Sequence, residues 1–91
     1  MLSLQDVIDY CDLDEGEIEA VAEHEHLPLA VAAEMGEALL STPEGVCRLH
    51  EMILDNIEHA LECGQVGHVE ELTCTYQHLQ RTHPLDAGMH V

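Results

Sequence analysis

Histidines and glutamates are concentrated in one short stretch of the chain, AEHEHLPLA, which spans residues 22–30. The stretch holds His24, Glu25 and His26 in succession, and Pro28 follows two residues later. Imidazole nitrogens and carboxylate oxygens are the protein ligands that suit Zn, Fe and Mn ions. The stretch therefore predicts a transition-metal site, provided that its side chains turn toward the interior.

Glu25 has the helical phase of a core residue. Positions seven apart in a helix point in nearly the same direction, and this spacing connects Ile18, Glu25, Ala32 and Leu39. We therefore expect the Glu25 carboxylate to face the core. A buried, unpaired carboxylate costs several kcal/mol, so it must be protonated, hydrogen-bonded, paired with a cation or bound to a metal. Protein cations are scarce, because the chain has two arginines and no lysine.

Antiparallel helices are expected to bring more histidines to the level of Glu25. If the chain turns near Thr42 and again near Gly64, His59 lies level with Glu25, and His68 is within roughly 3 Å along the helix axes. The alternative is a polar core without metal, in which Glu25 accepts a hydrogen bond from an adjacent histidine. The predicted ligands of a Zn, Fe or Mn ion used for storage, sensing or redox work are Glu25, His24, His26, His59 and His68. Whether the protein is an enzyme stays open.

Other histidines and cysteines suggest weaker sites. His50 also faces inward, but its level is roughly 16 Å from that of His68, so it belongs to another group. A lone histidine held by a hydrogen bond is the simpler interpretation of His50, with His83 as its nearest companion. Two pairs at a spacing of four residues could hold a soft metal at the surface or could arise by chance: His59 with Cys63, and Cys74 with His78.

The charge of the chain excludes some partners and favours others. The formal net charge is −17 in 91 residues, and only two aromatic residues are present. Nucleic acids and anionic membranes need a basic surface, so we exclude both as partners. Cations, a basic protein partner or a salty solvent suit this charge. The alternative function is therefore a metal-free interaction module, whose acidic surface responds to pH because protonation of all eight histidines changes the formal net charge from −17 to −9 (−17 + 8).

The elements that must position these residues are helices with clear ends. Apolar residues recur at helical spacing and no strand-like alternation competes, so we predict an all-α, up-and-down bundle. A single helical domain is expected over residues 1–84, followed by a flexible tail over 85–91. Asp14 with Glu17 three residues later is a capping pair that starts the second helix. The predicted elements are a short helix opened by Ser3, a long helix from Asp14 to about Ser41 kinked at Pro28, a helix from Pro43 to Gly64, and a helix from about Gln65 to Thr82.

Two further expectations come from chain length and cysteine placement. A 91-residue chain without Trp or Phe builds a small core, which makes a homodimer a plausible way to bury more surface.

Pro28 has two interpretations, a kink with room for an ion or a simple break between two shorter helices. The four cysteines are scattered singly and the N-terminal residues do not resemble a signal peptide, so we expect a cytoplasmic protein with reduced thiols.

Overall fold

The helix that carries the histidine-rich stretch begins with a capping box. In the computed structural model, which describes residues 14–85, helix α2 spans Glu15–Glu25. The Asp14 side chain accepts a hydrogen bond from the Glu17 N–H, and the Glu17 side chain accepts one from the Asp14 N–H. This reciprocal pairing satisfies two backbone donors, as the sequence predicted. The helix predicted near Ser3 lies outside the described residues.

Pro28 separates two helices. Helix α2 ends at Glu25, where His26 adopts a left-handed conformation with φ of 57°, and α3 spans Leu29–Leu40. The N–H groups of His26 and Leu27 both donate to the Ala22 carbonyl, which closes the last turn. Proline has no N–H to continue the helix, so the chain leaves the α2 axis here. The expectation of one kinked helix is therefore wrong, and the alternative of a break is confirmed.

The remaining helix ends follow the predicted signals. Helix α4 spans Pro43–Glu62, and the Thr42 hydroxyl accepts a hydrogen bond from the Gly45 N–H at 3.0 Å. After α4, Gly64 has a φ of 71°, a left-handed conformation that glycine adopts without steric cost. Helix α5 spans Val66–Thr82. No helix within residues 14–85 is both long enough and apolar enough to span a lipid bilayer.

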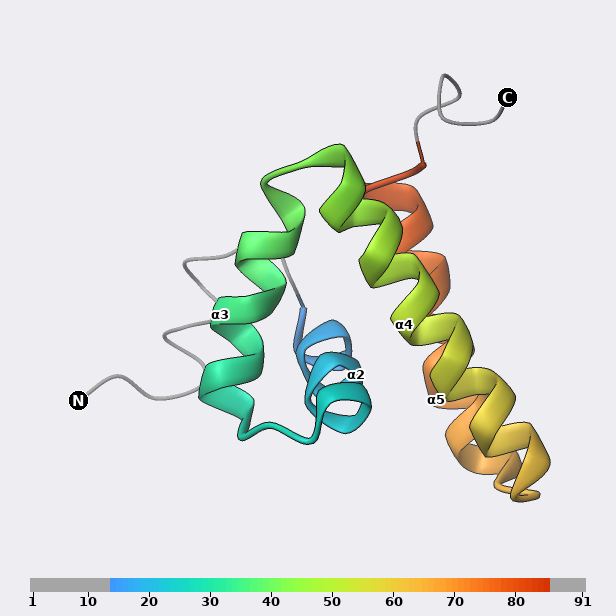
Figure 1. Ribbon diagram of the computed structural model, residues 1–91. Helices are drawn as coiled ribbons and strands as arrows, with labels where there is room; N and C mark the ends of the chain where they lie inside the picture. The colour runs from blue at the N-terminus through green and yellow to red at the C-terminus, as the bar shows by residue number, and fades with distance from the viewer. Residues whose placement is uncertain (1–13, 86–91) are drawn as a thin grey trace.

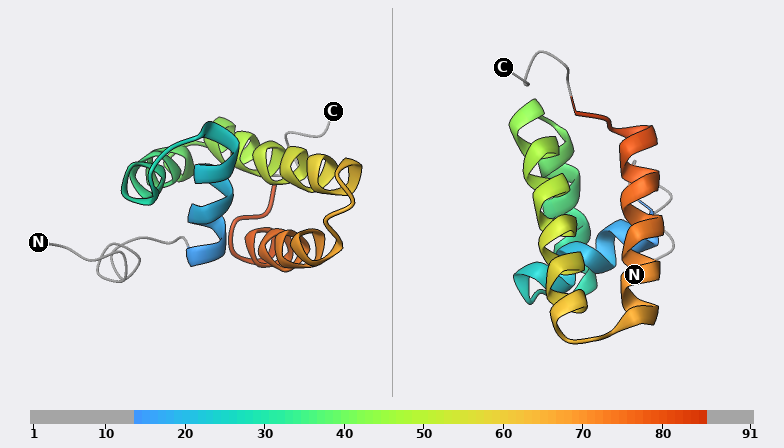
Figure 2. Two further views of the ribbon diagram at one scale, coloured as in Figure 1. Left: turned by 90° about the horizontal axis from the view of Figure 1, so that it is seen from below. Right: turned by 90° about the vertical axis from the view of Figure 1, so that its right-hand side faces the viewer.

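The helices form an all-α bundle in which one helix crosses the others. Helices α3, α4 and α5 alternate in direction, and α4 lies antiparallel beside α5 (Figure 1). Helix α2 runs across them and packs against all three (Figure 2). The up-and-down pattern thus holds for α3–α5, while α2 supplies the centre of the core. The largest fully buried apolar side chains are Ile18, Val21, Leu49, Met52, Ile53 and Leu79.

Two buried polar side chains connect the helices through hydrogen bonds. His50 is 2% exposed, and its Nε2 donates to the His83 carbonyl at 2.8 Å while its Nδ1 lies 3.2 Å from the Tyr76 hydroxyl. Asn56 donates from Nδ2 to the Ala20 carbonyl at 2.8 Å, which connects α4 to α2. His50 is thus the hydrogen-bonded inward histidine that the sequence indicated, with His83 as its companion.

Candidate functional site

The buried carboxylate of this protein belongs to Glu17, at the N-terminal end of α2. The Glu17 side chain is fully buried beside Ile18 and Val21. Its Oε1 accepts the hydrogen bond from the Asp14 N–H at 3.1 Å, whereas its Oε2 is buried and has no hydrogen-bond partner in the part of the chain that the structure describes. Burial raises the pKa of Glu17 to about 7, and the nearby Asp14 charge adds to this increase.

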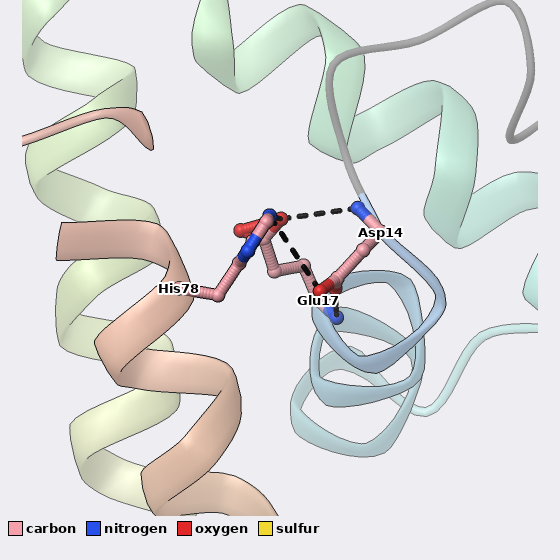
Figure 3. A group of neighbouring side chains, drawn as sticks. All are labelled: Asp14, Glu17 and His78. Carbon is pink, nitrogen blue, oxygen red and sulfur yellow. Dashed lines mark hydrogen bonds and ion pairs between the residues drawn. The ribbon is translucent and has the colours of Figure 1, made fainter. Parts of the chain in front are cut away.

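His78 extends from α5 toward this carboxylate (Figure 3). Its Nε2 lies 3.6 Å from Asp14 Oδ2 and 3.8 Å from Glu17 Oε1. These separations are too long for hydrogen bonds. They are slightly wider than the roughly 3.3 Å between two ligand atoms around a tetrahedral Zn ion with bonds of about 2.0–2.1 Å. The three ligand atoms all lie within 4.8 Å of one another, which makes them a candidate group for one ion.

The local sequence explains why these side chains meet. The capping box holds Asp14 and Glu17 together, because each side chain accepts from the backbone of the other residue. Gly16 lies between them, and a Cβ atom at this position would be 2.5 Å from the Thr75 hydroxyl of α5. The missing side chain thus lets α5 come close enough to bring His78 to the start of α2.

Four of the five residues predicted as ligands line a single pocket away from Glu17. They are His24, His26, His59 and His68. The pocket has a volume of about 720 Å³ and lies between the end of α2, α4 and the start of α5. The four histidines thus lie around one pocket, although α2 runs across α4 and not antiparallel to it. Its lining consists of Glu23, His24, His26, Asp55, Asn56, His59, Gln65 and His68. Metal binding by the four histidines stays a prediction.

Glu25 does not occupy the core position that its spacing indicated. Its side chain is 29% exposed, and its Oε2 accepts a hydrogen bond from His24 Nδ1 at 2.7 Å. The expectation of a buried Glu25 is wrong because α2 ends at this residue, so its last turn lies at the edge of the bundle. The hydrogen bond to an adjacent histidine, which the alternative proposed, is present between two half-buried side chains.

The pocket side chains are joined in pairs. His24 Nε2 lies 3.1 Å from Asp55 Oδ2, and His68 Nε2 donates to Glu23 Oε1. Three or more ligand atoms within 4.8 Å of one another occur at Asp14, Glu17 and His78, and nowhere else among residues 14–85. His59 Nε2 also lies 3.7 Å from Cys63 Sγ, so this predicted pair is in contact.

Sequence reasoning recognised the pair Asp14 and Glu17 as a helix cap and did not consider it as a site. The available signal was that Glu17 precedes Val21 by four residues, a spacing that places both side chains on one face of a helix. His78 was noted for its spacing from Cys74. No sequence pattern indicates that α5 packs against the start of α2.

Comparisons of this chain with protein families, with curated proteins and with solved structures found no match.

Proposed function

We propose that this protein binds a divalent transition metal ion through Asp14, Glu17 and His78. The observation that carries the proposal is the fully buried Glu17 carboxylate, whose Oε2 has no hydrogen-bond partner among the described residues and whose other oxygen, Oε1, lies 3.8 Å from His78 Nε2. A buried polar atom without a partner is costly, and a bound cation would remove that cost. One nitrogen and two carboxylate ligands without a thiolate suit Zn, Fe or Mn.

Metal binding at this position would connect two helices. Asp14 and Glu17 belong to the start of α2, and His78 belongs to the last third of α5. An ion shared by these residues would hold α5 against α2 and stabilise the folded state in proportion to its occupancy. Three protein ligands also leave a coordination position for water or another small ligand. Metal-dependent stability is the property that a metal sensor requires.

The test is a zinc titration of protein purified without a chelator and without a tag. Calorimetry is expected to give one ion per chain, and zinc is expected to raise the melting temperature. Glu17→Gln and His78→Ala each remove a ligand and should weaken binding by more than about ten-fold. Glu19→Gln is the matched control, because Glu19 lies on the same helix but is exposed.

Two results would contradict this proposal. Glu17→Gln and Glu19→Gln could bind zinc as tightly as the unmodified protein, which would exclude the buried carboxylate as a ligand. Alternatively, a variant that replaces His24, His59 and His68 by alanine could lose zinc binding while His78→Ala keeps it. The ion would then belong to the pocket that the sequence predicted.

A second candidate function is the binding of a basic protein partner. The observation that favours it is the composition of the pocket wall, where Glu23 and Asp55 are present and no lysine or arginine of the described residues takes part. The net charge of −17 would attract a basic partner over distances of about a Debye length. Such binding should weaken with added salt.

A further inference from the structure

The pocket that contains the four histidines is wider than a metal site. Its volume is about 720 Å³, which falls in the range of sites for organic groups. Within residues 14–85, three ligand atoms converge to within 4.8 Å at Asp14, Glu17 and His78, and at no position in the pocket. A single ion held directly by three pocket side chains therefore does not fit the geometry, whereas a larger cation does.

The pocket offers hydrogen-bond acceptors to such a cation. Glu23 and Asp55 contribute carboxylates from α2 and α4, and their side chains are 39% and 58% exposed, so a ligand can reach both. Asn56 lines the same pocket and is 5% exposed. Its Nδ2 donates to the Ala20 carbonyl, which leaves Oδ1 as the atom that can accept from a ligand.

We propose that this pocket binds the guanidinium group of an arginine side chain from a basic segment of a partner protein. The inference rests on the second candidate function and assigns its site. Guanidinium is a planar cation with five N–H donors, which suits two carboxylates and an amide oxygen better than a single ammonium group does. A protein source is favoured over a small free cation, because the charge of −17 extends beyond the pocket and attracts further basic residues.

The test compares a short arginine-containing peptide with the same peptide in which citrulline replaces arginine. Citrulline keeps the shape of arginine and removes its charge, so only the arginine peptide is expected to bind. The double variant Glu23→Gln/Asp55→Asn should weaken binding by about ten-fold. Glu34→Gln/Glu37→Gln is the matched control, because it removes the same charge from α3, away from the pocket, and it should change binding by less than about two-fold.

Nuclear magnetic resonance on the unmodified protein gives a second measurement that does not depend on variants. The arginine peptide is expected to shift the imidazole signals of His24 and His68, whose ring nitrogens contact the two carboxylates. Chemical-shift changes that occur only at residues other than His24 and His68 would overturn the proposal.

The possible failures are distinguishable. If both double variants weaken binding equally, the acidic surface binds the peptide without this pocket, so the assigned site is wrong while the second candidate function stands. If the arginine peptide does not bind at low salt, the second candidate function fails as well. If spermidine binds as tightly as the peptide and with the same dependence on Glu23 and Asp55, the pocket binds small organic cations and the proposal of a protein partner is wrong.

Discussion

Glu17 shows how one side chain can serve two purposes at a helix start. Its Oε1 completes the capping box with Asp14, which stabilises α2. Its Oε2 is buried without a partner among the described residues, and this destabilises the ionised carboxylate. Burial raises the pKa of Glu17 to about 7, although the capping hydrogen bond from the Asp14 N–H acts in the opposite direction. At the residue scale, this makes the stability of metal-free protein depend on pH.

The sign of this dependence follows from the direction of the pKa shift. In the folded protein Glu17 keeps its proton up to a pH of about 7, whereas the unfolded chain releases it near 4.5. The folded state therefore binds more protons between these values, so Glu17 makes the free energy of unfolding fall as pH rises from 4.5 to about 7. The loss is on the order of 3 kcal/mol.

Glu17→Gln should remove this contribution. We expect urea unfolding with a chelator present to show a smaller loss of stability between acidic and neutral pH for Glu17→Gln than for the unmodified protein. Glu19→Gln is the control, because Glu19 is exposed on the same helix. Equal pH slopes for the unmodified protein and Glu17→Gln would show that the buried carboxylate does not titrate in this range.

At the scale of elements, the short connection between α3 and α4 depends on a glycine. Gly45 is buried in the first turn of α4, and a Cβ atom at this position would overlap the carbonyl group of Leu39. The two helices can therefore approach only because Gly45 lacks a side chain. Gly67 lies in the first turn of α5, and a Cβ atom there would meet no neighbouring group within 4 Å.

These two glycines give a matched pair of substitutions. Gly45→Ala should lower the free energy of unfolding by about 1–3 kcal/mol, because α3 and α4 must move apart. Gly67→Ala should leave it unchanged or raise it by up to about 1 kcal/mol, because alanine favours the helix. Chemical denaturation measures both values. A Gly45→Ala protein as stable as the Gly67→Ala protein would show that this helix connection is not tightly packed.

At the scale of the whole molecule, charge opposes the compact state. The chain carries nineteen acidic residues against Arg48 and Arg81, and Arg48 lies 3.5 Å from Glu51. Few of the acidic residues can therefore pair with a positive side chain. Repulsion among the remaining charges weakens the folded state, and dissolved salt screens it over a distance of about 8–10 Å at physiological ionic strength.

Added sodium chloride should therefore raise the melting temperature of the metal-free protein. We expect the increase to be steepest at low ionic strength, where the screening length changes most. Sucrose at equal osmolarity is the control, because it stabilises folded proteins without screening charge. A melting temperature that rises equally in salt and in sucrose would contradict a dominant role for charge repulsion.

The expected homodimer stays a prediction, which sedimentation at several protein concentrations can test.

The parts of the structure that the sequence predicted are those that depend on neighbouring residues. Asp14 with Glu17, Thr42 with Pro43, and Gly64 each satisfy or end a helix through contacts within a few positions, so the helix ends could be recognised. The levels of antiparallel helices hold for α3–α5, because helix rise is constant, and His59 and His68 line one pocket with His24 and His26 although α2 runs across these helices.

The candidate metal site depends on contacts between distant parts of the chain, and only the tertiary structure decided it. The break at Pro28 turned α2 across the bundle, which left Glu25 at an edge and placed Glu17 beneath α5. Helical spacing gives the direction of a side chain around its own axis, but it does not say which neighbour covers that side. For this reason the sequence identified the helices and the residue types for binding, whereas the packing of α2 against α5 selected the carboxylate that became buried.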